Sequence, residues 1–173
     1  MELRKNIFTA LLIAIGFIIR QVTPSSIGGM HFDGFLSVMF VCILINDDFK
    51  NAMLTAFLGG VITAMTTTFP GGQIPNILDK FVTCLVLYAI IKVLGNFKSN
   101  PFVVGGIAFI GTLLSGSSFL IAAKYMVGLP VPFAVLFTGI VLPTSFMNII
   151  ITLSIYKAVT ISMRALGMNL VRP

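Results

Sequence analysis

The chain has few charged residues and few of the side chains that usually carry catalysis or metal binding. Charged residues make up 9% of its 173 residues, and it contains one histidine, two cysteines and no tryptophan. Cys42 and Cys84 each stand alone in an apolar stretch, so we expect neither a disulfide framework nor a metal site. Because there is no second histidine and no GxxxxGK[ST] phosphate loop, we expect no enzyme, no cofactor and no ATPase activity in this chain.

Apolar sequence, in contrast, is abundant. Apolar residues make up 57% of the chain, against about 45 to 50% in soluble domains, and the mean hydropathy is +1.07. We therefore predict an all-α membrane protein, a compact bundle of six transmembrane helices forming one domain over residues 1–173. The expected spans, separated by Gly, Pro, Asn, Asp and Ser, are 6–22, 34–46, 51–68, 76–95, 102–124 and 132–157.

The basic residues predict the orientation of these spans. The net charge of +6 is dispersed along the chain, which favours an orientation signal over a nucleic-acid patch. With both termini cytoplasmic, Arg20, Lys80 and Lys124 lie outside, and eight basic residues lie inside: Arg4, Lys5, Lys50, Lys92, Lys98, Lys157, Arg164 and Arg172.

The second span is the weak point of this topology. Gly34 to Ile45 offers only twelve uncharged residues, or ~18 Å of helix against ~30 Å of hydrocarbon. The segment is short, tilted, buried in the bundle or re-entrant. A re-entrant segment would give five crossings and an external amino terminus, and would sort the basic residues seven to four.

The segment from Thr66 to Lys80 is a polar, Gly/Pro-broken run between two apolar stretches. We expect a helix to begin near Pro75, because proline suits a first helical turn. Spacing of i, i+3, i+4 and i+7 then gives one polar stripe that descends from the outer mouth: Asn76, Asp79, Lys80 and Thr83. Ionisable groups at membrane depth by default mark a ligand or ion pathway. The structural alternative is that Asp79 favours the positive helix end while Lys80 snorkels outward.

Further candidate ligand-binding residues lie near the same mouth, each with a structural alternative. Asp33 is also a suitable N-cap for the following helix, and His31 is also typical of a solvated loop. Asn148 follows a kink expected at Pro143 and equally suits a bond to a neighbouring helix. The remaining candidates are Gln73, Phe69 and Lys124.

Two other features near this mouth favour structural roles. For Arg20 we favour snorkelling to the membrane interface. We attribute the small residues of the run Ser115 to Ser118 to helix packing. Together, the carboxylates, cations and apolar groups of the outer half suit a zwitterion with a large hydrophobic side chain, although a neutral heterocycle or a weak acid also fits.

Three sequence features resemble a known transporter family. Ala10-x-x-x-Ala14, six spans and a compact outer site resemble the substrate-binding S components of energy-coupling factor (ECF) transporters. Two blocks, Gly28 to Asp33 and Thr67 to Lys80, resemble the tryptophan-transporter (TrpP) family within that group.

This resemblance implies a subunit of the prokaryotic cytoplasmic membrane that captures tryptophan or a related aromatic amino acid from outside. It implies association with a transmembrane coupling protein and a pair of ATPase subunits, with Ala10 and Ala14 facing the coupling protein. The alternative is a partner-free secondary carrier or small channel in which Asp79 or His31 relays protons.

Overall fold

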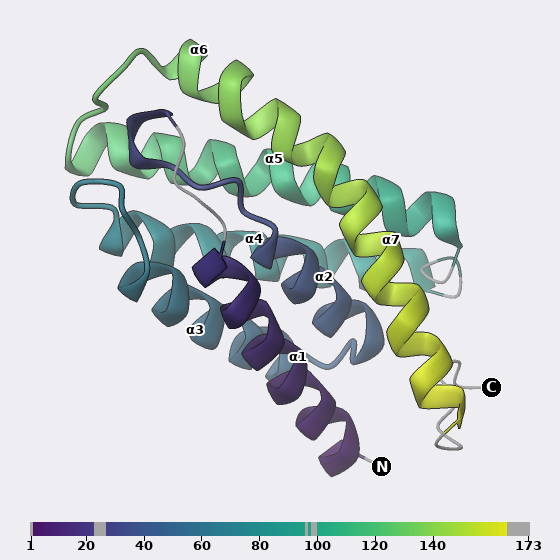
Figure 1. Ribbon diagram of the computed structural model, residues 1–173. Helices are drawn as coiled ribbons and strands as arrows, with labels where there is room; N and C mark the ends of the chain where they lie inside the picture. The colour runs from purple at the N-terminus through teal and green to yellow at the C-terminus, as the bar shows by residue number, and fades with distance from the viewer. Residues whose placement is uncertain (1, 23–26, 96, 98–99, 166–173) are drawn as a thin grey trace.

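The computed structural model describes residues 2–22, 27–95, 97 and 100–165, and within them it is a bundle of helices (Figure 1). Each of the six expected spans corresponds to one helix or one helical rod, so the predicted all-α membrane bundle is confirmed. The elements are α1 (Glu2–Val22), the short 3-10 turn η1 (Ile27–Gly29), α2 (Phe35–Ile45), α3 (Phe49–Met65), α4 (Gln73–Leu94), α5 (Pro101–Met126), and a last rod of α6 (Phe133–Leu136), η3 (Phe137–Val141) and α7 (Leu142–Ala165).

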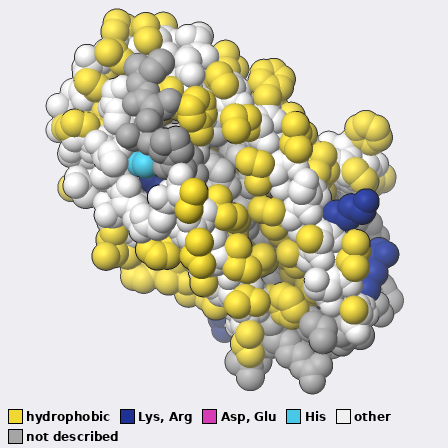
Figure 2. Space-filling model, viewed as in Figure 1, with side chains coloured by type: hydrophobic (Ala, Val, Ile, Leu, Met, Phe, Trp, Pro, Cys, Tyr) yellow, Lys and Arg dark blue, Asp and Glu magenta, His cyan; other side chains and the backbone are white. Residues whose placement is uncertain are grey.

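Three of these elements are long and apolar enough to cross a membrane: Lys5–Val22 of α1, the whole of α5, and the rod Phe133–Ala165. α2 and α3 are apolar but shorter. α4 is long enough but carries Asp79, Lys80 and Lys92. Large apolar side chains cover much of the molecular surface (Figure 2), as expected for helices in contact with lipid.

The topology agrees with six crossings. The beginning of α1 and the end of α7 lie at one end of the bundle, while the loops before α2 and after α3 lie at the other (Figure 1). An odd number of crossings would separate α1 and α7 at their free ends. Of the residues in the charge count, Lys98, Arg172 and the side chain of Arg4 lie outside the described part of the chain.

The short helix α2 is the centre of the bundle rather than a lipid-facing span. All eleven of its residues are buried, and it contacts α1, α3, α4, α5 and α7. Eleven residues give only about 16 Å of helix, and the buried carbonyl groups at the end of so short a helix need donors from elsewhere in the protein. Asn51 of α3 supplies them, since its Nδ2 donates to the carbonyl oxygens of Cys42 at 3.0 Å and Asn46 at 2.8 Å.

The last rod contains a wide π turn, η3, which ends two residues before Pro143. Proline has no N–H group, and its ring collides with the preceding turn of a regular helix. A π turn inserts one extra residue and is a common cause of a local change in helix direction. The expected kink in this helix is therefore accompanied by a π turn, and two residues of this turn, Ile140 and Val141, line the cavity described next.

Candidate functional site

A cavity opens among the loops at the end of the bundle opposite the chain ends. The empty space in it, including the open mouth, is about 510 Å³. One side is charged and hydroxylated, and the other is apolar. The lining residues are Arg20, Gly29, Met30, His31, Asp33, Leu36, Thr67, Phe69, Asn76, Asp79, Lys80, Thr112, Ser115, Gly116, Phe119, Ile140, Val141 and Thr144.

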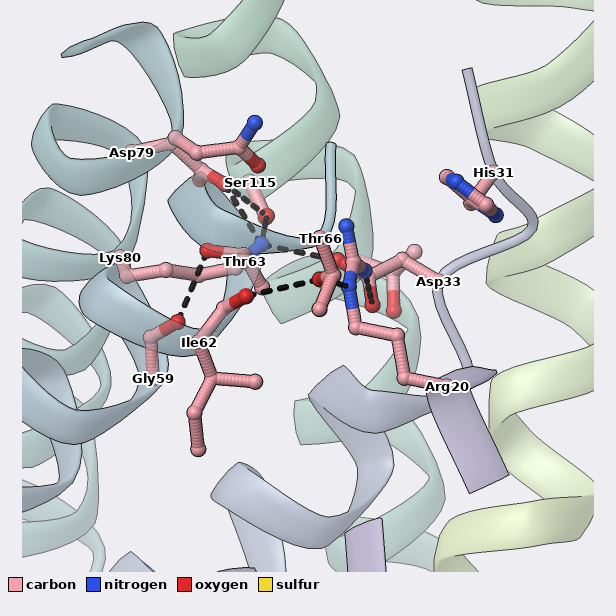
Figure 3. A network of polar contacts seen from close by, with 12 residues as sticks. Arg20, His31, Asp33, Gly59, Ile62, Thr63, Thr66, Asp79, Lys80 and Ser115 are labelled. Atoms are coloured by element: carbon pink, nitrogen blue, oxygen red, sulfur yellow. Dashed lines mark hydrogen bonds and ion pairs between the residues drawn. The ribbon is translucent and has the colours of Figure 1, made fainter. Parts of the chain in front are cut away.

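Four charged side chains form one continuous network on the polar side (Figure 3). Arg20 Nη1 lies 2.9 Å from Asp33 Oδ1, and Lys80 Nζ lies 2.9 Å from Asp33 Oδ2. Lys80 Nζ also lies 2.7 Å from Asp79 Oδ2. Two cations and two carboxylates therefore balance one another, although they come from α1, α4 and the loop before α2.

Lys80 is buried at the centre of this network. Its residue exposure is 1%, and its ammonium group donates to Asp33, Asp79 and Ser115. Asp79 is equally buried and accepts from Lys80, Ser115 and Thr83. The interpretation that Lys80 snorkels outward is therefore wrong, because all three of its N–H groups point to partners within the bundle.

Asp33 is not the N-cap of α2. The cap residue is Gly34, which has no side-chain capping bond, and the Asp33 carboxylate instead binds Arg20 and Lys80. Burial alone raises the pKa of Asp33, but the charges of Lys80 and Arg20 outweigh it and hold that pKa below its ordinary value. Asp33 is thus an ionised carboxylate, and its side chain is 18% exposed toward the cavity.

Arg20 is buried rather than directed to the membrane interface. Its residue exposure is 6%, and besides the pair with Asp33 its Nε donates to Thr66 Oγ1 at 2.6 Å. The preference for snorkelling was therefore wrong for this residue. The two bonds tie the outer end of α1 to the loop before α2 and to the end of α3.

The apolar side of the cavity is built from loop and helix residues that pack on one another. Phe69 and Phe119 meet edge to face, with ring centroids 5.2 Å apart. Met30, Ile140 and Val141 belong to the same buried cluster. Such a wall accommodates a large apolar or aromatic group next to the charged network.

Hydrogen bonds join two loops at the mouth of the cavity. Thr68 Oγ1 donates to the carbonyl oxygen of Gly29 at 2.7 Å and lies 3.1 Å from His31 Nε2. Gly29 has a φ of 79°, and a Cβ at this position would lie 2.7 Å from the Thr68 carbonyl oxygen. Only glycine permits this backbone conformation and this close approach. The single histidine is visible at the surface in Figure 2, beside a basic side chain.

The structure brings most of the predicted ligand-binding residues to this cavity. Six of the ten line it: Phe69, Asn76, Asp79, Lys80, Asp33 and His31. Thr83 is buried behind Asp79 and donates to it. Asn148 is buried too, and its Nδ2 donates to the Asp33 carbonyl oxygen at 3.1 Å and to Thr112 Oγ1 at 3.0 Å.

Two predicted residues lie away from the cavity lining. Gln73 is exposed at the first turn of α4, and Lys124 is exposed near the end of α5, 5.9 Å from the ring centre of Tyr125. Neither belongs to the residues that line the cavity.

Sequence reasoning missed several lining residues. Ser115 was attributed to helix packing, yet its Oγ donates to Asp79 Oδ2 at 2.9 Å. Thr112 and Thr144 are hydroxyl residues within long apolar stretches, and Met30 and Phe119 are ordinary membrane residues by type. A hydroxyl residue within an apolar stretch was the available sequence signal for Ser115, Thr112 and Thr144. No signal in the sequence separates Phe119 from lipid-facing phenylalanines.

The cavity wall depends on close contact between α5 and η3 at Gly116. A Cβ at Gly116 would lie 2.5 Å from Val141 Cγ1, and a β-branched side chain has little freedom to move away. We expect Gly116→Ala to lower the free energy of unfolding by about 1–3 kcal/mol. Chemical denaturation in mixed micelles measures this loss, and adding Val141→Ala is expected to restore part of it.

Gly106→Ala is the matched control for this change. Gly106 lies on the same helix, and nothing lies within 4 Å of a Cβ built there. We expect this variant to be at least as stable as the unaltered protein, because alanine favours helix by about 0.5–1 kcal/mol over glycine. Equal stability of the two alanine variants would contradict the proposed close contact.

Residues 2–164 match the family described as "Tryptophan transporter TrpP". Three bacterial proteins, each named "Probable tryptophan transport protein", are similar over nearly their whole lengths. The chain is 42% identical over 164 residues to that of Clostridium perfringens, covering 90% of both chains. It is 38% identical to that of Clostridium acetobutylicum, covering 95% of this chain and 96% of the relative. It is 36% identical to that of Bacillus subtilis, covering 95% of both.

No solved structure matches the chain. The apolar helices and the bacterial relatives together identify a multi-pass protein of the cell membrane. The family match includes every residue that lines the cavity. The chain therefore belongs to the tryptophan transporter TrpP family.

Proposed function

We propose that this protein is the substrate-capture subunit of an ATP-driven ECF-type uptake transporter, and that its substrate is tryptophan. The observation that carries the proposal is the cavity at the loop end of the bundle, which joins a balanced network of four charges to an apolar, aromatic wall. A zwitterion with a large aromatic side chain is complementary to both halves. The family and the names of the relatives support tryptophan as that zwitterion.

The charged network suggests how the two charges of an amino acid are bound. We assign the ammonium group to Asp33, because its carboxylate is the more exposed of the two at 18%, against 1% for Asp79. We assign the carboxylate to Arg20, since a guanidinium group has five N–H donors in a planar fork that matches carboxylate geometry. Asp79 and Lys80 lie deeper and hold Asp33 in position.

Three other predicted residues support this site. Asn148 holds the Asp33 backbone, Thr83 orients Asp79, and Asn76 lines the cavity where its side chain donates to the Gly72 carbonyl oxygen. The indole ring packs against Phe69 and the neighbouring apolar residues. Binding of the ring and of the charges at one site explains a preference for aromatic amino acids over either fragment alone.

The energy for uptake is proposed to come from partner subunits. The sequence has no phosphate loop for ATP. Ala10 and Ala14 lie exposed on the outward face of α1, where small residues permit close packing with another helix. A transmembrane coupling protein that contacts this face, together with a pair of ATPase subunits, completes the proposed transporter.

Two measurements test the proposal. Saturable binding of tryptophan to the purified chain is expected, and its absence would overturn the ligand assignment. The chain is also expected to co-purify with ATPase subunits from its own cells, and Ala14→Trp is expected to abolish this association. Uptake into liposomes that contain only this chain, driven by a proton gradient, would instead favour the secondary carrier.

A further inference from the structure

Thr144 is a buried hydroxyl on the apolar side of the cavity. It lies in the first turn of α7, directly after Pro143, and its residue exposure is 4%. Its Oγ1 donates to the carbonyl oxygen of Ile140 at 2.6 Å. A hydroxyl group has one proton, so this bond leaves Oγ1 only its acceptor lone pairs for any other partner.

The other cavity hydroxyls are used differently. Ser115 donates to Asp79 and accepts from Lys80, and Thr112 donates to Ala108 and accepts from Asn148. Thr67 Oγ1 accepts from the Phe69 backbone N–H. Among the described residues that line the cavity, Thr144 is thus the hydroxyl that donates its proton to a backbone carbonyl oxygen and accepts no hydrogen bond.

The neighbours of this acceptor make its position specific. Ile140 and Val141 precede Thr144 by one helical turn and line the cavity with it, as do Gly116 and Phe119 of α5. The acceptor therefore belongs to the wall that suits an aromatic ring rather than to the charged network. Thr144 Oγ1 is already satisfied as a donor, and a ligand N–H that reaches its lone pairs adds a second hydrogen bond in a site shielded from water.

The chemistry of the aromatic amino acids selects one donor. An indole ring has an N–H group that donates and does not accept. A phenyl ring has no donor, and a phenol hydroxyl brings an acceptor as well as a donor. An indole is therefore the aromatic side chain whose polar atom matches an acceptor-only oxygen in an apolar wall.

We propose that Thr144 Oγ1 accepts the indole N–H of the bound substrate and thereby sets the preference for tryptophan over other aromatic amino acids. This inference rests on the proposed function of the cavity. The π turn contributes to it, because one residue more or less before Thr144 would rotate its side chain by about 100° around the helix axis.

Binding of two ligands tests this role. Tryptophan is compared with 3-(3-benzothienyl)alanine, in which sulfur replaces the indole N–H group and the ring shape is retained. We expect the purified protein to bind tryptophan roughly 10-fold more tightly, because the analogue has no N–H group to donate to Oγ1. Thr144→Val is expected to remove this preference by weakening tryptophan binding alone, while Thr144→Ser, which keeps the oxygen, retains it.

Thr138→Val is the matched control. Thr138 lies in the same rod, donates to the Ala134 carbonyl oxygen in the same way, and is exposed away from the cavity. This variant is expected to leave both affinities unchanged. An equal loss of both ligands in Thr144→Val would overturn the inference and leave the capture function standing.

If Thr144→Val does not fold, the unaltered protein still decides the question, since equal affinity for tryptophan and its sulfur analogue excludes the bond. No tryptophan binding at all would overturn the capture function and this inference together.

Discussion

Asp33→Asn is expected to raise the dissociation constant for tryptophan by about 100-fold or more. The change removes the carboxylate assigned to the substrate ammonium group while keeping nearly the same side-chain size. Removing one partner of a buried, hydrogen-bonded charge pair costs about 2–5 kcal/mol of binding free energy, and 2.8 kcal/mol corresponds to about 100-fold in affinity. The loss also leaves Arg20 and Lys80 without the group that separates them.

Isothermal titration of the purified protein with tryptophan measures this effect. Asp48→Asn is the control, because it makes the same substitution at the start of α3, where the described structure shows no side-chain capping bond. Lys124→Gln is a second control, since it removes an exposed cation that does not line the cavity. A folded Asp33→Asn variant with nearly unchanged affinity would refute the assignment of the ammonium group.

Lys80→Met is expected to cause the largest loss of stability. Lys80 is the cation between Asp33 and Asp79, at 2.9 Å and 2.7 Å from their oxygens. Methionine has a similar length but no charge, so both carboxylates would remain in the bundle without their shared partner. Breaking a buried ion pair in this way costs about 3–5 kcal/mol, because the remaining charge is uncompensated.

A second substitution separates this effect from simple loss of packing. Lys80→Met combined with Asp79→Asn removes the deeper carboxylate as well, and we expect it to recover a large part of the lost stability. Buried ion pairs replaced as a whole are often neutral in stability, unlike pairs that lose one member. Unfolding in mixed micelles with increasing denaturant gives the free energies to be compared.

Lys92→Met is the matched control on the same helix. The Lys92 side chain is 49% exposed, and its ammonium group lies 3.7 Å from Asp47 Oδ2. Exposed pairs of this kind contribute about 0–1 kcal/mol, so this variant is expected to unfold almost like the unaltered protein. Similar stability of Lys80→Met and Lys92→Met would show that the buried network does not support the fold.

The amino-acid sequence by itself determined the class of protein and the places of its helices. Long continuous apolar stretches separated by polar residues and glycines indicate membrane helices, because a helix satisfies its own backbone hydrogen bonds in lipid. The periodicity of the segment around Pro75 also placed Asn76, Asp79, Lys80 and Thr83 on one buried stripe of α4. Both inferences depend on local spacing, which the sequence states directly.

The tertiary structure alone decided which of the polar residues meet. Asp33 pairs with Lys80 across 47 positions of the chain and with Arg20 across 13, and Ser115 reaches Asp79 from another helix. Taken singly, Asp33 suited a helix cap and Arg20 suited a snorkelling cation, because each of these roles has the lower free-energy cost for an isolated residue. Packing of α1, α4 and α5 around the short buried α2 makes the paired arrangement favourable instead, since buried charges require partners that only other helices supply.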